Sequence, residues 1–415
     1  MKSFLILILV LFLNFSSVFA QVWEQKLNGR SVWSLASDNQ GNVYAGGLTG
    51  SNSRIWKSSD GGNNWDTVYT ASGQSVWDFA FDELGGIYAA NYSSGMIRST
   101  NNGGNFFVIP PSVFSNKNLQ GVRCGNNGYV FVTTSTGFFR STDYGQTFNE
   151  TALSGLNCLP VAVDIDSSNI IYAGVTSASG SGIGFYRSTD FGLTFSQNLN
   201  PGKNCYSILQ RLNGDLFMIS TTSPYNIDIS VNKGLTWTTI GNLPSAQRDI
   251  SESLYGLYTA GNGGVFKSLN GGSNFVNYNF TLSATPVLNI NYKNTLKLLA
   301  GVSGSSNGGV WIHTEGFILS ANNSDNEISG YSLRQNYPNP FNPSTTIEFT
   351  LPEDKFVKLK VFDATGKEIL SLVNNFLLSG NYSFDFNGND LESGIYFYNL
   401  NAGNFYSSGK MILMK

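Results

Sequence analysis

Short runs of apolar residues recur along the first three quarters of the chain, separated by polar, glycine-rich breaks. One set comprises residues 76–81, 86–90 and 95–99. Runs of this length between turn residues are typical of β-strands rather than helices. From about residue 331 the pattern changes to strict alternation, as in 358–362, which predicts strands with one face in a core. No helical period is present, so the pattern predicts an all-β chain.

An eight-residue box follows each set of three runs. It reads Ser-x-[Asp/Asn]-x-Gly-x-[Asn/Thr]-[Trp/Phe], and its third residues are Asp60, Asn101, Asp143, Asp190, Asn232 and Asn270. An Asp or Asn side chain bonds to nearby backbone amides, and glycine tolerates positive φ. The closing ring buries up to about 150–250 Å² beneath the turn. We interpret the box as a structural turn between the third and fourth strands of a repeating unit.

The spacing of the boxes predicts the architecture. They begin at residues 58, 99, 141, 188, 230 and 268, in steps of 41, 42, 47, 42 and 38 residues. Periods of roughly 40–45 residues with strand-like content are typical of four-stranded propeller blades. Runs at 287–292, 296–300 and 309–313 supply three strands of a further blade without a box, and residues 22–27 supply its fourth. We therefore predict a seven-bladed β-propeller over residues 21–314, in which the N-terminal strand closes the last blade and removes exposed sheet edges.

The box resembles the Asp box of bacterial-neuraminidase-type repeats, and residues 21–314 resemble the sialidase-like propeller superfamily. That resemblance covers six copies at near-constant spacing. It implies that the box is a structural corner remote from the ligand face. It also implies relatives as different as sortilin-like receptors, photosystem II assembly factors and xyloglucan hydrolases, so it specifies no activity.

The C-terminal part is predicted to be a separate domain. A polar stretch at 315–330 forms a linker, and residues 331–415 contain short alternating strands typical of a small Ig-like β-sandwich. This segment resembles the type A C-terminal sorting domain of the type IX (Por) secretion system, through Asn336-Tyr337-Pro338-Asn339-Pro340-Phe341-Asn342-Pro343, the 363–367 turn, the 394–398 strand and the Lys-Met-Ile-Leu-Met-Lys end. The resemblance implies a partner, the type IX machinery, and a bacterium of the Bacteroidota type. An ordinary accessory Ig-like module is the alternative.

Residues 1–20 have the charged, apolar and small-residue regions of a secretory signal peptide. The apolar run at 4–13 is shorter than the about 20 residues that span a bilayer, so a membrane anchor is the less favoured alternative, and no other segment approaches transmembrane length. Together with the sorting domain, this predicts a protein secreted across the outer membrane and then released or held at the cell surface.

Composition narrows the function classes. With 24 Lys and Arg against 27 Asp and Glu, the net charge of −3 argues against nucleic acid as a partner. Cys124, Cys158 and Cys205 leave one thiol unpaired on an oxidising route; Cys158 and Cys205 stand near the starts of neighbouring inner strands, but buried free thiols are favoured. His313 is the only histidine and is interpreted as a surface or packing residue. We expect no metal site and no cofactor.

No catalytic set is recognisable. The Arg-Ile-Pro motif of sialidases is missing, since Arg54 is followed by Ile55 and Trp56. Arg98, Arg140 and Arg187 each precede a box and are expected to lie on the blade surface. Asp78 and Asp249 lie on or beside inner strands, but nothing in the sequence places them opposite each other, as glycoside hydrolysis by paired carboxylates requires.

What remains is a candidate ligand face formed by the loops that enter each first strand and join the second strand to the third. Its candidate residues are Arg30, Trp33, Trp77, Tyr92, Arg123, Tyr206, Tyr225 and Arg248. Aromatic planes among neutral polar groups suit sugars or peptide segments. The alternative for Trp33 and Trp77 is packing between blades. We therefore expect a non-catalytic binding or scaffold propeller with a glycan or surface-protein ligand. The alternatives are a divergent sialidase-like glycoside hydrolase and a surface module without a dedicated small ligand.

Overall fold

The computed structural model describes residues 22–415, except for 177–181, 197, 212, 222, 254–255, 269, 283–286, 293–296, 305–306, 315–329, 354, 378–379 and 389–390. The predicted signal peptide and nearly all of the predicted linker lie outside the described residues. Apart from strands, the described part contains one 3-10 turn, η1 (Pro111–Phe114).

The strands up to residue 314 form seven sheets within the described part of the chain, six of four strands and one of three. The first strands are β2 (Ser31–Ser37), β6 (Val76–Phe81), β10 (Leu119–Cys124), β14 (Cys158–Val163), β17 (Cys205–Gln210), β21 (Gln247–Ser253) and β25 (Val287–Tyr292). The second strands are β3 (Val43–Thr49), β7 (Ile87–Asn91), β11 (Val130–Thr134), β15 (Ile171–Val175), β18 (Leu216–Ser220), β22 (Gly256–Gly261) and β26 (Lys297–Val302). The third strands are β4 (Asn52–Ser58), β8 (Gly95–Ser99), β12 (Gly137–Ser141), β16 (Gly184–Ser188), β19 (Asn226–Ser230), β23 (Gly264–Ser268) and β27 (Gly309–Thr314). The fourth strands are β5 (Asp66–Ser72), β9 (Phe107–Ile109), β13 (Asn149–Ala152), β20 (Thr238–Asn242), β24 (Val276–Asn277) and, in the last sheet, β1 (Trp23–Asn28).

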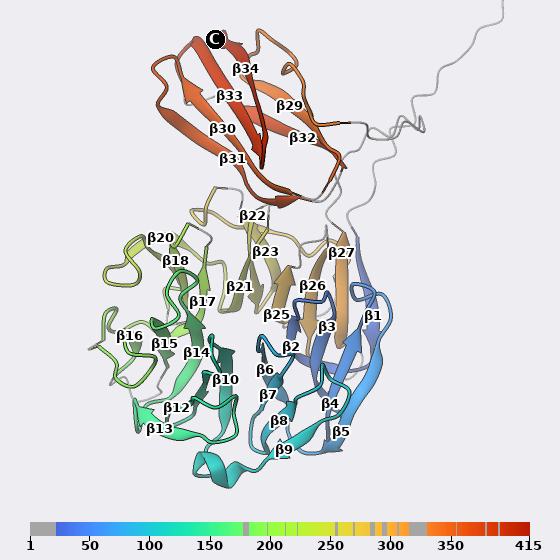
Figure 1. The fold of residues 1–415 in the computed structure, drawn as a ribbon, viewed down its shortest axis with the longest axis vertical. Helices are drawn as coiled ribbons and strands as arrows, with labels where there is room; N and C mark the ends of the chain where they lie inside the picture. Colours follow the sequence, from blue (N-terminus) through green and yellow to red (C-terminus); the bar gives the residue numbers. More distant parts are fainter. Residues whose placement is uncertain are drawn as a thin grey trace, which may run out of the picture.

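The seven sheets form a closed ring. The first strands contact one another in chain order, and β25 contacts β2 (Figure 1). Sheets packed on both sides leave the second strands without a solvent face, and β7, β11, β15 and β18 are buried at every residue. This double burial is why the second strands are continuous apolar runs in the sequence, whereas the fourth strands are mostly exposed. The architecture is a β-propeller.

The ring closes by the pairing of its N-terminal strand with its last third strand. In this antiparallel pair, Trp23 lies opposite His313 and Asn28 opposite Gly309. The Trp23 indole Nε1 donates to the Tyr278 carbonyl at 2.9 Å, and its backbone N–H donates to Thr281 Oγ1 at 2.7 Å. His313 is fully buried, with Nδ1 3.0 Å from the Val22 carbonyl and Nε2 3.2 Å from the Tyr278 hydroxyl. The single histidine is thus a packing residue of the closing seam and not a surface residue.

All six boxes fold into the same hydrogen-bonded turn. In each, the serine hydroxyl donates to Oδ1 of the third residue at 2.7–3.0 Å and accepts the N–H of the glycine at 2.8–3.0 Å. The seventh residue donates its N–H to the same Oδ1 at 2.9–3.0 Å. The turn therefore satisfies its own polar groups whether its third residue is Asp or Asn.

The box glycines also allow neighbouring sheets to pack closely. Gly145 has φ 74°, and a Cβ built on it would lie 2.7 Å from Tyr88 of the preceding sheet, so only glycine fits. Arg98 reinforces the same junction by donating to the Gly145 carbonyl at 3.3 Å, and Arg140 likewise donates to the carbonyl of Phe191 in the next box. The expectation that these arginines are surface residues is wrong for Arg98, which is 8% exposed, because it bridges two sheets.

The C-terminal domain consists of two sheets around one core. One has the order β28-β29-β32 and the other β31-β30-β33-β34. Its strands are β28 (Ser332–Leu333), β29 (Ser344–Leu351), β30 (Lys355–Asp363), β31 (Glu368–Leu377), β32 (Gly380–Asn387), β33 (Gly394–Ala402) and β34 (Phe405–Leu413). Alternate residues of both sheets, among them Ile347, Leu359 and Tyr398, meet in a single buried cluster. The strict alternation in the sequence reflects this one-sided burial.

The three cysteines are free thiols, and Cys158 and Cys205 are buried. Burial raises the pKa of the Cys158 thiol to about 12. Both side chains therefore act as small apolar core residues.

We expect the substitution His313→Phe to destabilise the protein by about 1–3 kcal/mol, because it keeps the ring volume but removes the hydrogen bonds of the buried imidazole to the Val22 carbonyl and the Tyr278 hydroxyl. Urea unfolding followed by tryptophan fluorescence measures this change. Thr314→Ala, at an exposed neighbouring position, is the control and is expected to be nearly neutral. Equal stability of the two variants would contradict the role of His313 in the seam.

The Asp residues of the boxes predict that the stability of the folded protein depends on pH. Partial burial raises the pKa of Asp143, but hydrogen bonds from Thr147, Ser141 and Gln146 outweigh it and leave the pKa below its ordinary value. A lowered folded-state pKa stabilises the protein above the unfolded-state value of about 4, and this contribution is lost as the pH falls through the folded-state value. We therefore expect Asp143→Asn to be less stable than the wild type at neutral pH, with a difference that shrinks near pH 3.

Box five provides the matched control for this experiment. There Asn232 accepts the Thr236 N–H and donates Nδ2–H to the Thr236 hydroxyl at 2.8 Å, so an amide fits the turn. The reverse change, Asn232→Asp, is expected to make stability more acid-sensitive. Urea unfolding at both pH values measures both variants, and a stability difference independent of pH would refute the assignment.

Candidate functional site

A β-bulge occurs at the same place in every first strand, and it determines where the predicted site residues lie. The register shifts across one extra residue, which is Trp33 in β2, Trp77 in β6, Gln120 in β10, Tyr206 in β17 and Arg248 in β21. The shifts in β14 and β25 fall between Cys158 and Val161 and between Val287 and Asn289. Bulges re-aim side chains. Four of the predicted residues thus occupy equivalent positions around the ring.

Three of the predicted aromatic residues form a stack across the first two sheets. The rings of Trp33 and Trp77 are 5.7 Å apart at 10°, and those of Trp77 and Tyr92 are 4.4 Å apart at 21°. All three side chains are half-buried, and the Trp33 indole N–H donates to Ser31 Oγ at 3.0 Å. The stack agrees with the alternative of packing between blades, because much of the Trp77 ring surface is engaged within the protein.

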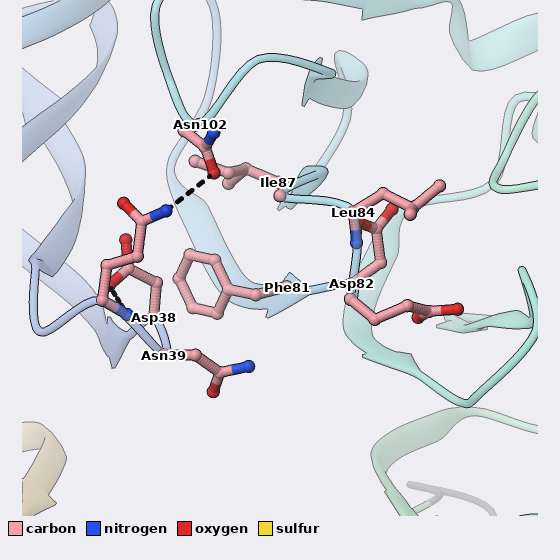
Figure 2. A pocket seen from close by; sticks show the side chains of 10 residues that line it. Asp38, Asn39, Phe81, Asp82, Leu84, Ile87 and Asn102 are labelled. Carbon is pink, nitrogen blue, oxygen red and sulfur yellow. Dashed lines mark hydrogen bonds between the residues drawn. The ribbon is translucent and has the colours of Figure 1, made fainter.

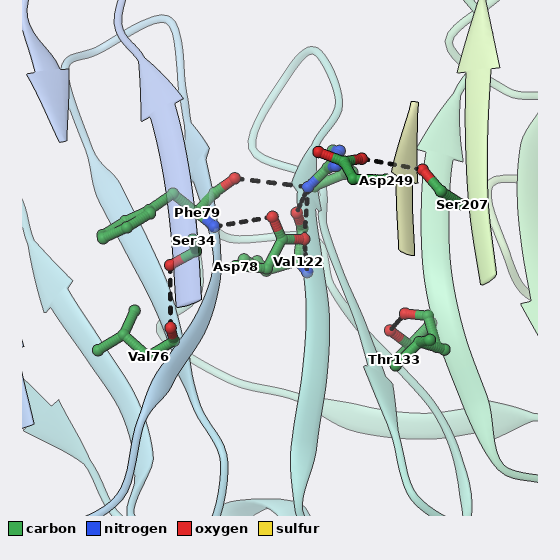
Figure 3. Close-up of polar contacts among 10 residues, drawn as sticks. Ser34, Val76, Asp78, Phe79, Val122, Thr133, Ser207 and Asp249 are labelled. Atoms are coloured by element: carbon green, nitrogen blue, oxygen red, sulfur yellow. Dashed lines mark hydrogen bonds and ion pairs between the residues drawn. The ribbon is translucent and has the colours of Figure 1, made fainter. Parts of the chain in front are cut away.

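Arg123 is held by an ion pair with Asp78 of the preceding sheet (Figure 3). Its Nη1 lies 2.5 Å from Asp78 Oδ2 and also donates to the Val122 and Phe79 carbonyls at 2.6 and 3.4 Å. Asp78 also accepts the backbone N–H groups of Phe79 and Val122. These contacts join the second and third sheets, and the two side chains neutralise each other's charge.

Other residues just after the bulges connect neighbouring sheets in the same way (Figure 3). Ser34 donates to the Val76 carbonyl at 2.9 Å, and Ser207 donates to Asp249 Oδ1 at 3.1 Å. Asp249 also accepts the Ile250 N–H at 3.0 Å. Asp78 lies on the second sheet of the ring and Asp249 on the sixth. Each carboxylate serves its own junction between sheets.

Tyr206, Tyr225 and Arg248 form a second group on the fifth and sixth sheets. Both tyrosines pack against the same core cluster, and the exposed Arg248 guanidinium lies 5.9 Å from the Tyr206 ring centroid. In the described part of the chain, Arg248 forms no ion pair. Arg30 belongs to neither group by its contacts, and its Nη1 lies 3.5 Å from the Gly29 carbonyl. The eight predicted residues are thus divided between a stack, an ion pair, a cation–aromatic group and a single arginine.

A pocket of about 200 Å³ lies elsewhere, at the box side between the first two sheets (Figure 2). Its lining includes Asp38, Phe81, Asp82, Leu84 and Asn102. The Asp38 and Asp82 carboxylates already accept hydrogen bonds from the turns that carry them. The pocket is smaller than typical ligand sites of about 300–1,000 Å³. It contains none of the predicted site residues.

The described residues contain no cluster of three or more His, Cys, Asp or Glu side chains that could hold a metal ion. They also contain no helix of sufficient length and hydropathy to cross a membrane.

The proline-rich segment of the C-terminal domain lies along its last strand, β34. The Phe341 N–H donates to the Ile412 carbonyl at 2.9 Å, and the Met414 N–H donates to the Phe341 carbonyl at 3.0 Å. Asn339 accepts the Ile412 N–H and donates to the Lys410 carbonyl. Asn336 is buried and bonds to Thr345 and to the Pro338 carbonyl. The segment therefore holds the end of the chain in place.

The family model of the secretion system C-terminal sorting domain matches residues 335–414. This domain is a type IX sorting domain. The chain is accordingly exported across the outer membrane. A search of curated proteins finds no match.

Solved structures similar to this chain are propellers. PorZ, described as an essential surface component of the type-IX secretion system of Porphyromonas gingivalis, matches with a TM-score of 0.51 and 15% identity over 93% of this chain and 60% of PorZ. YCF48 bound to D1 peptide matches with a TM-score of 0.56 and 13% identity over 73% of this chain and 97% of that chain. A GH74 enzyme of Niastella koreensis matches with a TM-score of 0.54 and 15% identity over 71% of this chain and 44% of the enzyme. At these identities the likeness shows the fold alone.

We expect Arg123→Met to destabilise the protein by about 1 kcal/mol, because the half-buried Asp78 would lose its charged partner. Arg334→Met is the control, since the pair of Arg334 with Glu348 is more exposed, with side chains 68% and 48% accessible. Loss of this exposed pair is expected to cost less than about 0.5 kcal/mol. Denaturant midpoints of the two variants decide the question, and equal midpoints would show that the Arg123 pair is not a sheet junction.

Proposed function

We propose that the exported propeller is a non-catalytic binding or scaffold module. It takes a glycan or surface-protein ligand at the face of the ring that carries the first-strand bulges at Trp33, Trp77, Tyr206 and Arg248, which we call the bulge face. One observation carries this proposal. The groups best suited to chemistry on that face, Asp78, Arg123 and Asp249, are engaged in contacts between sheets. Groups suited to binding remain accessible, namely the Tyr206–Arg248 group and the half-buried edges of the aromatic stack.

The domain organisation belongs to the same proposal. A signal peptide at 1–20 directs export to the periplasm, residues 21–314 form a seven-bladed Asp-box propeller, 315–330 form a linker, and 331–415 form an Ig-like sorting domain. The seven sheets and the pairing of β1 with β27 support the blade count. The two sheets sharing one core support the sandwich. The source is a bacterium of the Bacteroidota type, and the type IX machinery is the partner of residues 331–415.

The two groups on the bulge face suggest different ligand chemistry. Arg248 over the Tyr206 ring offers a positive charge that has no carboxylate partner among the described residues, and it therefore favours an anionic group. The aromatic stack has no free charge and favours an apolar or neutral ligand surface. Because the stack lies on the first two sheets and the Tyr206–Arg248 group on the fifth and sixth, only an extended ligand would contact both.

The test is a binding screen of the full chain on an array of neutral and carboxylate-bearing glycans, with released sugar measured at every spot. We expect retention without release. Arg248→Ala is expected to weaken binding of carboxylate-bearing glycans by about tenfold, the loss of one charge-assisted contact. Arg334→Ala on the sorting domain is the control. Sugar release would replace the proposal by glycoside hydrolysis, and absence of any glycan binding would leave a protein ligand.

A further inference from the structure

The outer face of one sheet in the sorting domain carries apolar residues that no other described part of the chain covers. In β33 and β34, side chains alternate between the core and the outer face, and the inward set includes Tyr396, Tyr398 and Met411. The outward set begins with Ile395 and Phe397, which are 45% and 38% exposed with the propeller present. Both side chains are therefore exposed even when the propeller is attached to the sorting domain.

Strand pairing brings these outward residues together. Ile395 lies opposite Ile412, and Phe397 lies opposite Lys410 on one side and Phe362 on the other. Ile412 and Phe362 are half-buried. We call Phe362, Ile395, Phe397 and Ile412 the apolar corner. Lys410 lies at its edge and has no ion pair within the described part of the chain.

Away from the apolar corner, the same face is mainly polar. Further along the sheet, Tyr406 lies opposite Asn401, which in turn lies opposite Lys358. Lys360 is paired with Glu368 at 2.7 Å. The apolar side chains are thus concentrated at one end of the face, near the C-terminus, where Met414 is also 56% exposed. A concentrated exposed apolar surface on a soluble domain marks an interaction site.

Backbone contacts determine how a partner can approach. The free edge of β34 is occupied near this corner by the segment that contains Asn339 and Phe341, which bonds to residues 410, 412 and 414. An added β-strand would find these groups already used. A partner must therefore contact the outer side chains rather than extend the sheet.

We propose that the apolar corner is the docking surface through which the sorting domain engages the export machinery, on a partner with an apolar surface and a carboxylate facing Lys410. A second copy of this chain is a poorer occupant. Four partly exposed side chains cover far less than the about 800 Å² per partner of a stable interface. A small surface suits a transient contact that releases its cargo after export. This inference is independent of any ligand of the propeller.

The test compares export of full-chain variants in a strain that has a type IX secretion system. The double variant Ile395→Ser, Phe397→Ser is expected to reduce the surface fraction at least about tenfold, with the chain retained in the periplasm. Tyr406→Ser is the matched control, because Tyr406 is 63% exposed on the outer face of the same sheet at its opposite end. It is expected to be exported normally.

A second pair of variants covers the case in which the double variant fails to fold, which thermal unfolding would reveal. Lys410→Glu reverses the charge at the apolar corner, and Lys358→Glu does so at the polar end of the same face. We expect a several-fold loss of surface display for Lys410→Glu alone. The proposal is overturned by normal export of a folded double variant, by an equal loss in Tyr406→Ser, or by equal effects of the two lysine changes.

Discussion

Closure of the ring is the constraint on which the propeller depends. A sheet edge left open exposes unpaired backbone groups, and a ring of sheets has such a gap unless its two ends pair. The pairing of β1 with β27 joins residues almost three hundred positions apart, and Trp23 and His313 bury the junction under aromatic side chains. The box of the first sheet reaches the same region, since Gly62 packs against Leu299 and Ile312 of the last sheet.

Within the closed ring, polar and charged residues are used mainly to join one sheet to the next. Box glycines pack against the preceding sheet, Arg98 reaches the following box, and Asp78, Ser34 and Ser207 connect neighbouring first strands. Asp78 and Arg123 pair with each other across two sheets, and Asp249 accepts a hydrogen bond from Ser207 of the neighbouring sheet, so these side chains contribute to the architecture of the ring.

The sorting domain is stabilised in a different way from the propeller. Its core is its own, formed by alternate residues of two sheets, and its proline-rich segment fastens the last strand through backbone bonds at Phe341 and side-chain bonds at Asn339. Fastening the chain end gives the outer face of β33 and β34 a defined shape. A rigid face is what a transient contact during export requires, because little conformational entropy is then lost on docking.

The sequence by itself determined the repeating architecture and the route of export. Both depend on local patterns: the box satisfies its own hydrogen bonds within eight residues, alternation reports one-sided burial, and the sorting motif is contiguous, as the family match over 335–414 confirms. Only the tertiary structure decided which contacts the candidate site residues make. The bulges at Trp33, Trp77, Tyr206 and Arg248 appear only when two strands are paired, and the contact of Arg123 with Asp78 spans 45 residues. A sequence pattern cannot reveal such pairings, because they are set by the register between strands and by the packing of one sheet on the next.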